Sequence, residues 1–162
     1  MKIKYVTGDM LEGPEHMIAH GCNAQGVMGS GVAKAIRDRY ALAFTQYRTV
    51  YEKTGLSVGD VITVMCPGRV VFDAITQEFY GRNPNRVYVS YDGLRQAFFA
   101  INDSEIVRRR SDVMGEPEPI AMPLIGAGLA NGKWSIISQI IEDESINFQP
   151  VVYLLDGKMP DG

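Results

Sequence analysis

The chain of 162 residues (17.9 kDa) is 46% hydrophobic and 22% charged, a composition typical of folded globular domains. Its net charge of −3 and isoelectric point near 5.4 argue against a surface that binds duplex nucleic acid. No apolar run is long enough to span a bilayer, so we expect one soluble domain over residues 1–162 that has no membrane partner.

Strand and helix patterns alternate along most of the chain. In chain order, we predict strands at 2–6 and 17–20, helices at 31–40 and 43–53, strands at 61–65 and 70–76, a helix at about 91–107, a strand at 119–124, a helix at 133–144 and a strand at 150–155. This alternation predicts an α/β fold with three α/β/α layers around a mixed, mostly parallel sheet of about six strands.

Two polar segments interrupt these elements. The basic run at 108–110 follows the predicted helix at 91–107 and precedes a polar stretch at 111–119, which we predict to be an exposed loop. We interpret the basic run as a solvated helix end that complements the helix dipole, rather than as a binding patch. The segment GRNPNR at 81–86 is expected to form another exposed loop.

The cysteines and the first residues bear on the cellular compartment. Cys22 and Cys66 alone cannot form a disulfide framework, so we interpret them as reduced, buried cysteines. The opening MKIKYVTGDM alternates as a strand does and lacks the apolar stretch of a signal peptide. We therefore expect a cytoplasmic protein.

The segment GCNAQGVMGSGVAKAI at 21–36 is the strongest functional signal. A glycine-rich turn lets backbone N–H groups approach an anion, and the helix after it adds about half a positive charge at its N-terminus. We expect it to bind a phosphate or pyrophosphate. The spacing fits neither the P-loop nor the G-x-G-x-x-G dinucleotide motif, whose third glycine is replaced by Lys34.

A second glycine-rich loop at 126–128 follows the predicted strand at 119–124. Ligands of parallel sheets bind at the carboxyl ends of the strands, where loops lead into helices. We therefore expect the loops at 26–31 and 126–128 to face one another and to bind the two phosphates of a pyrophosphate.

Four motifs resemble the macro domain family, whose members bind ADP-ribose. They are TGDM at 7–10, HGCNAQGVMGSGVAKAI at 20–36, MPLIGAGLANGKW at 122–134 and VVYLL at 151–155. From the first motif to the last, they are distributed over nearly the whole length of the chain. The HxCNxxGxxGxGxA form is most similar to the small group of yeast-type ADP-ribose 1″-phosphate phosphatases. It is also similar to macro domains that remove ADP-ribose from proteins or DNA.

The resemblance implies that residues near the two ends of the chain together form one adenine site. The Asp9 carboxylate would accept a hydrogen bond from the adenine amino group, and the Met10 amide would meet a ring nitrogen. An N-cap role for Asp9 is the structural alternative. Leu155, in the segment 153–156, would belong to the wall of the adenine site, although alternating core residues would give the same pattern.

The resemblance also implies that two loops bind phosphate through their backbone amides. These loops comprise Gly26, Val27, Met28, Gly29, Ser30, Gly31 and Val32, and Ile125, Gly126, Ala127, Gly128 and Leu129. Loop glycines are more often simple turn formers, but two such loops at strand ends favour a binding role. Ser30 would offer its hydroxyl to the ligand or cap the helix.

We predict His20 and Asn23 as the catalytic residues at the distal ribose. The amide of Asn23 offers a donor and an acceptor to the ribose hydroxyls, or it only satisfies the turn backbone. The match to the phosphatase group implies that His20 acts as base or nucleophile toward the 1″-phosphate, because histidine titrates near neutrality. The alternative is a hydrogen-bonded structural histidine.

The sequence departs from macro domains that form a covalent lysine adduct. In these hydrolases a lysine follows Ile-Thr of the middle strand and an acid follows GxGL. Here Gln77 follows Ile75-Thr76, and Ala130 follows Leu129, so we expect that mechanism to be absent. Residues 77–80 would line the distal pocket or continue the strand.

The leading hypothesis is a monomeric phosphatase that hydrolyses ADP-ribose 1″-phosphate to ADP-ribose and phosphate. We expect no cofactor and no metal, because two histidines and two cysteines scattered along the sequence give no ligand cluster. Two alternatives stay open: a non-catalytic ADP-ribose reader, and a hydrolase that removes ADP-ribose from protein or nucleic acid without a lysine nucleophile. The alternatives would make ADP-ribosylated macromolecules its partners.

Overall fold

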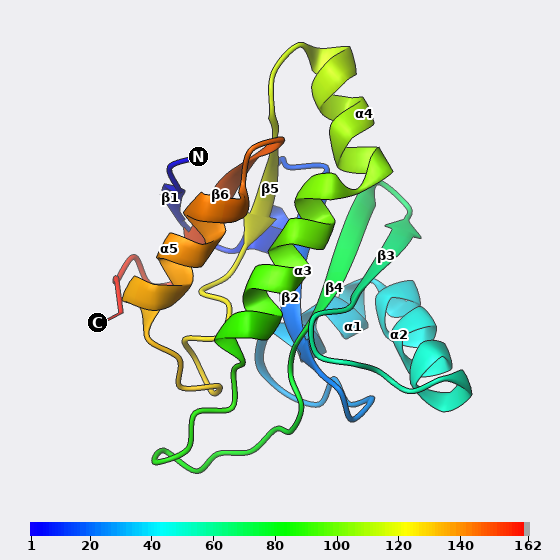
Figure 1. Cartoon of the computed structure of the whole chain (residues 1–162), viewed down its shortest axis with the longest axis vertical. Helices are drawn as coiled ribbons and strands as arrows, with labels where there is room; N and C mark the ends of the chain where they lie inside the picture. The colour runs from blue at the N-terminus through cyan, green and yellow to red at the C-terminus, as the bar shows by residue number, and fades with distance from the viewer. Residues whose placement is uncertain (161–162) are drawn as a thin grey trace.

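A six-stranded sheet forms the middle layer of the computed structural model, which describes residues 1–160 (Figure 1). The strands are β1 (Lys4–Thr7), β2 (Met17–Asn23), β3 (Val61–Cys66), β4 (Arg69–Gln77), β5 (Glu118–Met122) and β6 (Phe148–Leu154). The helices are the short 3-10 helix η1 (Met10–Glu12), α1 (Gly31–Arg39), α2 (Ala41–Lys53), α3 (Tyr91–Asp103), α4 (Glu105–Met114) and α5 (Trp134–Glu144).

The sheet is mixed and mostly parallel, as predicted. Its strand order is β1-β6-β5-β2-β4-β3, and only the β3–β4 pair is antiparallel. The two-residue turn at 67–68 joins this hairpin, and Gly68 has a φ of +79°, a conformation that glycine adopts at little cost. Because all the other pairs are parallel, the carboxyl ends of β1, β6, β5, β2 and β4 lie at one edge of the sheet.

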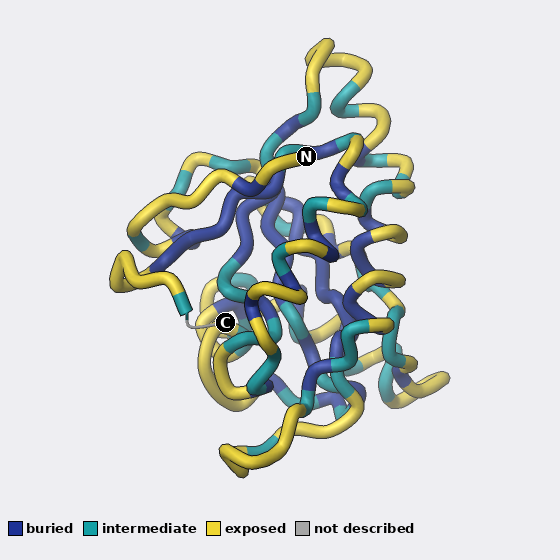
Figure 2. Tube along the Cα trace, turned by 60° about the vertical axis from the view of Figure 1, so that its left-hand side comes forward, coloured by how far each residue is buried: buried dark blue, intermediate teal, exposed yellow. Residues whose placement is uncertain are grey.

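Helices cover both faces of the sheet and confirm the three-layer prediction. On one face, an apolar core that includes Phe72, Phe98 and Ile137 packs the sheet against α3, α4 and α5. On the other face, Ile36 of α1 and Tyr47 of α2 belong to two clusters packed against β2 and β4. Figure 2 shows the buried residues gathered along the strands between these layers.

The single helix that we predicted over 91–107 is wrong. The structure has two helices, because Ser104 adopts an extended backbone conformation with φ −64° and ψ 145° between α3 and α4. The Ser104 hydroxyl donates to the Ile101 carbonyl, and the Ser104 amide donates to the same oxygen, so the last turn of α3 closes on this residue. Serine favours such helix ends because its side chain competes for backbone partners.

The basic run at 108–110 is not a helix end, although Arg108 and Arg109 are solvent-exposed, as predicted. These arginines lie inside α4, which ends one residue before Gly115 with its φ of +74°. The Arg110 guanidinium makes a two-point ion pair with the buried Glu118 carboxylate at the start of β5. The predicted loop at 111–119 therefore shrinks to the few residues between α4 and β5.

Three further expectations concern the loop at 81–86, the two cysteines and membrane-spanning helices. The loop at 81–86 lies outside helices and strands and is largely exposed, as predicted. Both cysteines are free; Cys22 is buried, whereas Cys66 at the end of β3 is partly exposed and departs from the prediction. Within residues 1–160, none of the helices has the length and apolar character needed to cross a bilayer.

Candidate functional site

A cavity of about 820 Å³ opens at the carboxyl edge of the sheet, where β2 and β4 end and the loop after β5 begins. It is lined by residues 20–23, 27, 29–33, 76–77, 80–82, 123–126 and 128–130. Loops at this edge form the usual ligand site of open α/β sheets. Its volume lies within the ~300–1,000 Å³ range of small-molecule pockets.

Most of the predicted site residues line this one cavity. They are His20, Asn23, Val27, Gly29, Ser30, Gly31, Val32, Ile125, Gly126, Gly128 and Leu129. Gly26, Met28 and Ala127 belong to the same loops but lie behind the lining; Met28, for example, is only 1% exposed and packs in the core. The two glycine-rich loops predicted to cooperate therefore do meet.

The predicted adenine residues lie outside the cavity lining. Asp9 and Met10 follow β1, and Leu155 follows β6, so all three sit at the same sheet edge as the cavity but on other strands. Asp9 caps η1, because its Oδ1 accepts a hydrogen bond of 2.9 Å from the Leu11 amide. The cap leaves the other carboxylate oxygen of this exposed side chain available to a ligand.

The first loop carries backbone amides that lack protein partners. Among the described residues, the hydrogen bonds found leave the N–H groups of Gly29, Ser30 and Gly31 without an acceptor. Ser30 occupies the N-cap position of α1, yet its side chain makes no capping bond. An unpaired helix N-terminus with a free hydroxyl is well suited to an anion.

The side chain of Asn23 holds this loop together. Its Oδ1 accepts from the amides of Gln25 (2.9 Å) and Val27 (3.4 Å), and its Nδ2 donates to the Val27 carbonyl (2.8 Å). The buried Tyr47 hydroxyl donates to the Asn23 backbone oxygen (2.6 Å) and lies 3.0 Å from Oδ1. Burial raises the pKa of Tyr47, which keeps this hydroxyl protonated as a donor. One Nδ2 hydrogen of Asn23 remains for a ligand.

The second loop depends on a glycine at its bend. Gly126 has a φ of +78°, and a Cβ there would lie 2.8 Å from a methyl carbon of Val89. The Gly126 carbonyl accepts a hydrogen bond of 2.7 Å from the Gly132 amide, which closes the loop in front of α5. Within residues 1–160, the amides of Gly126 and Gly128 have no acceptor among the bonds found, so both are available to a ligand.

Thr76 adds a buried hydroxyl to the cavity wall that the sequence analysis did not select. The residue is 1% exposed, and its Oγ1 has no hydrogen-bond partner among the described residues. A Cβ on Gly21 would lie 2.7 Å from this oxygen, so glycine is needed opposite it. Buried polar atoms are normally paired, so this hydroxyl is suited to a polar group inside the cavity.

Below the cavity, His20, Cys22 and Asp73 form a buried cluster. His20 Nε2 lies 2.6 Å from Asp73 Oδ1, and Cys22 Sγ lies 3.6 Å from the same nitrogen. The strand register sets His20 opposite Asp73 on neighbouring strands, and no member is more than 3% exposed. Burial raises the pKa of Asp73, although the hydrogen bond from His20 acts in the opposite direction. The pKa of Cys22 is also raised, first by burial and second by the charge of Asp73.

Neither Asp73 nor a cluster of metal-binding side chains was predicted from the sequence. Asp73 lies 53 residues from His20, and only the β2–β4 pairing brings them together. A signal was present, because a single acid interrupts the apolar run RVVFDAIT at 69–76. Charged residues are rarely fully buried unless they are paired, so an aspartate in a buried strand indicates a partner.

The mouth of the cavity carries aromatic and basic side chains. Of residues 77–80, Gln77 and Tyr80 line the cavity, as expected, whereas Glu78 and Phe79 lie outside its lining. Arg82 adds a cation that was not foreseen. The Arg86 guanidinium lies 5.4 Å from the ring centre of the exposed Phe79, which is within cation–π range.

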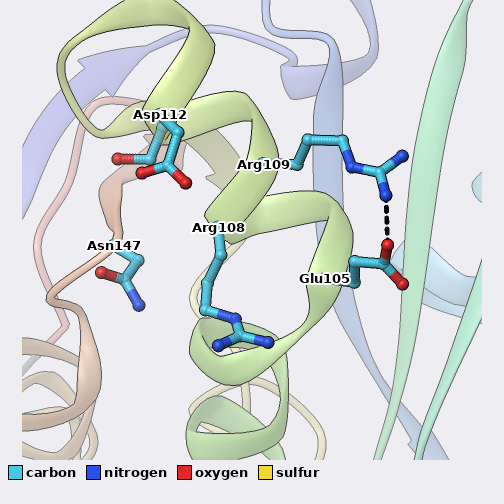
Figure 3. A pocket seen from close by; sticks show the side chains of 6 residues that line it. Glu105, Arg108, Arg109, Asp112 and Asn147 are labelled. Carbon is cyan, nitrogen blue, oxygen red and sulfur yellow. Dashed lines mark hydrogen bonds and ion pairs between the residues drawn. The ribbon is translucent and has the colours of Figure 1, made fainter.

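A second hollow of about 340 Å³ lies at the opposite edge of the sheet, against α4 (Figure 3). Its lining side chains are Glu105, Arg108, Arg109, Ser111, Asp112 and Asn147. Arg109 pairs with Glu105 one helical turn away, and both are well exposed. The mixed charges and the polar surface give this hollow no defined ligand chemistry.

Comparisons with known proteins agree with this architecture. A family model described as Macro domain matches residues 19–141. A DNA ADP-ribosyl glycohydrolase of Thermus aquaticus is 26% identical over 145 residues, which are 87% of this chain and 37% of that protein. An ADP-ribose 1″-phosphate phosphatase of Neosartorya fischeri is 43% identical over 49 residues, 30% of this chain and 24% of that protein.

The chain thus spans well under half the length of both curated relatives. Among solved structures, the macrodomain of Thermus aquaticus DarG superposes with a TM-score of 0.70 over 94% of this chain and 97% of that one. At 21% identity, this likeness concerns the fold alone.

Proposed function

The chain belongs to the Macro domain family, and from this membership we propose that it binds ADP-ribose and hydrolyses a bond at the distal ribose. One observation carries the proposal: two glycine-rich loops and the unpartnered hydroxyl of Thr76 share a single cavity at the carboxyl edge of the sheet. The two curated relatives described above are named for hydrolysis of ADP-ribose derivatives, which supports the same class of chemistry.

The unpaired amides support a proposal in which the two loops bind the diphosphate. Gly29 to Gly31 and the N-terminus of α1 would bind one phosphate, and the amides of Gly126 and Gly128 would bind the other. The adenosine half would then extend along the sheet edge toward Asp9 and Leu155. The distal ribose would lie over Thr76, whose buried hydroxyl has no partner among the described residues.

We propose ADP-ribose 1″-phosphate as the substrate. A water attacks the phosphorus, the bond from phosphorus to the ribose oxygen breaks, and that oxygen takes a proton, which leaves ADP-ribose and phosphate. His20 is the proposed proton-transfer group, because it lies in the cavity wall and Asp73 fixes its Nε2. A histidine oriented by a carboxylate is the usual arrangement of a hydrolytic base.

A second candidate is the removal of ADP-ribose from a macromolecule. The relative that aligns with 87% of the chain is a glycohydrolase, whereas the phosphatase relative aligns with 30%. With Gln77 in place of the lysine expected of the covalent mechanism, a water molecule would be the nucleophile. Tyr80 and Arg82 at the cavity mouth would face the macromolecule.

Two measurements test these proposals. Titration calorimetry with ADP-ribose should show binding of one ligand per chain, and the absence of heat would overturn the proposal for both reactions. Release of phosphate from ADP-ribose 1″-phosphate should then be compared with release of ADP-ribose from ADP-ribosylated DNA and from protein modified on acidic residues. Turnover of the first substrate alone supports the phosphatase, and turnover of either of the others alone supports the second candidate.

A further inference from the structure

The cluster of His20, Cys22 and Asp73 has the composition of a metal site. One ligand atom from each side chain lies within 4.8 Å of the other two. Tetrahedral zinc with one nitrogen, one sulfur and one oxygen ligand sets these atoms about 3.3–3.7 Å apart. The Cys22 Sγ to His20 Nε2 distance of 3.6 Å already lies in this range. The 2.6 Å contact between His20 and Asp73 would need to widen by about 0.7 Å to reach the nitrogen–oxygen separation.

The cluster is incomplete as a hydrogen-bond network. Asp73 is fully buried, and its Oδ2 has no partner among the described residues. A buried oxygen left unpaired is destabilising, and more so when it is charged. The single hydrogen bond to His20 satisfies one carboxylate oxygen only.

Charge balance favours a divalent ion at this position. A neutral imidazole, a thiolate and a carboxylate together carry two negative charges, so a divalent cation makes the buried group neutral. Neutral groups are the least costly to bury in an apolar setting. Thiolate, imidazole and carboxylate together select zinc-like ions over magnesium or calcium, which prefer oxygen ligands.

We propose that His20, Cys22 and Asp73 bind a zinc-class divalent metal ion. The ion reaches them through the cavity, because His20 and Cys22 both belong to its lining. Three protein ligands leave the fourth position to a water molecule or to an oxygen of the bound ligand, as in open zinc sites. The inference does not depend on ADP-ribose being the ligand of the cavity.

Metal binding changes the role of His20. The nitrogen that now contacts Asp73 would become a ligand, so the neutral imidazole would carry its proton on Nδ1 and could not accept another while the metal is bound. The two states are therefore separable: His20-dependent hydrolysis belongs to the metal-free protein, and metal binding is measured without any turnover assay.

The test uses the whole chain, freed of metal with a chelator and titrated with Zn²⁺ and with Co²⁺. We expect one equivalent of Zn²⁺ per chain by equilibrium dialysis and elemental analysis. With Co²⁺ we expect the absorption bands of a tetrahedral site with a thiolate ligand. Failure of the metal-free protein to bind Zn²⁺ while it remains folded by circular dichroism would overturn the proposal.

Variants locate the ion. Cys22→Ser, a nearly isosteric change, should weaken Zn²⁺ binding by at least about tenfold and abolish the thiolate band. Cys66→Ser is the matched control, because Cys66 lies on β3 outside the cluster, and it should bind as the unchanged chain does. Binding that survives Cys22→Ser or is lost in Cys66→Ser would refute the assignment.

Discussion

Nε2 of His20 lies 2.6 Å from Oδ1 of Asp73, and neither side chain is more than 1% exposed. The two residues occupy facing positions on β2 and β4, so the contact is set by the strand register rather than by a flexible loop. A histidine fixed in this way keeps one tautomer and one orientation, which is what proton transfer requires.

His20→Ala should reduce the turnover of ADP-ribose 1″-phosphate by the metal-free protein at least about tenfold, because the proposed proton-transfer group is removed. The affinity for ADP-ribose should change little. The control is His16→Ala, which alters an exposed histidine outside the cavity lining. Unchanged turnover in His20→Ala would remove this residue from the mechanism.

Thr76→Val should weaken ADP-ribose binding about fivefold, because the ligand loses one hydrogen bond. The stability of the fold should stay the same or rise, since the hydroxyl has no protein partner. Thr63→Val is the matched control, a threonine in the exposed part of β3. Calorimetry and urea unfolding measure the two effects, and a destabilised Thr76→Val with wild-type affinity would contradict the prediction.

Asn23→Ala should lower the free energy of unfolding by about 1–3 kcal/mol, because the loop amides lose their shared acceptor. Tyr47→Phe should cost less, about 1 kcal/mol, since it removes one hydroxyl from the same network. Urea unfolding of the single and double variants provides a double-mutant cycle. Strictly additive effects would show that the two side chains do not act together.

Gly126→Ala should destabilise the protein by about 1–3 kcal/mol, because its backbone is left-handed and the new methyl group meets Val89. Gly128→Ala serves as the control for stability alone: no atom lies within 4 Å of a Cβ at that position. Thermal unfolding compares the two. Equal loss in both variants would indicate that the bend at Gly126 is not the cause.

The stability of the metal-free protein should fall as the pH rises above about 9, with Cys22 contributing to the fall. Burial first, and the Asp73 charge second, raise the folded-state pKa of Cys22 above its usual 9.0, so the unfolded chain loses this proton first. The contribution of Cys22 to the free energy of unfolding is fully present below the unfolded-state pKa, and it is lost as the pH rises toward the folded-state pKa. Urea unfolding from pH 7 to about pH 10 should show a shallower decline for Cys22→Ala. An unchanged slope would contradict this prediction.

Sequence patterns were sufficient for features that repeat locally. The alternation of strands and helices predicted the layers, and the glycine spacing at 26–31 and 126–128 located both loops of the cavity. The end of β2 was not predictable in this way: the strand continues to Asn23, three residues beyond the prediction, through a bulge after Cys22.

Features that depend on distant pairing were missed. Asp73 meets His20 only because β4 pairs with β2. Arg110 meets Glu118 only because α4 packs beside the start of β5. The break at Ser104 is a local event, but serine occurs inside helices often enough that the residue alone does not locate it. The residues predicted to bind adenine share the sheet edge with the cavity but not its wall, a distinction that depends on strand order.

The position of β2 between β4 and β5 has a consequence for exchange with solvent. An inner strand bonded on both sides opens only when much of the domain unfolds, whereas loop amides exchange through small local openings. Addition of a ligand should therefore slow deuterium uptake at residues 26–32 and 125–129. It should leave unchanged the amides of Met17 and Ile18, where β2 pairs with both neighbours, and of Asp73, where β4 does. The proposed catalytic pair would then lie on inner strands whose amides exchange slowly, and the ligand-binding amides would lie in loops that exchange fast.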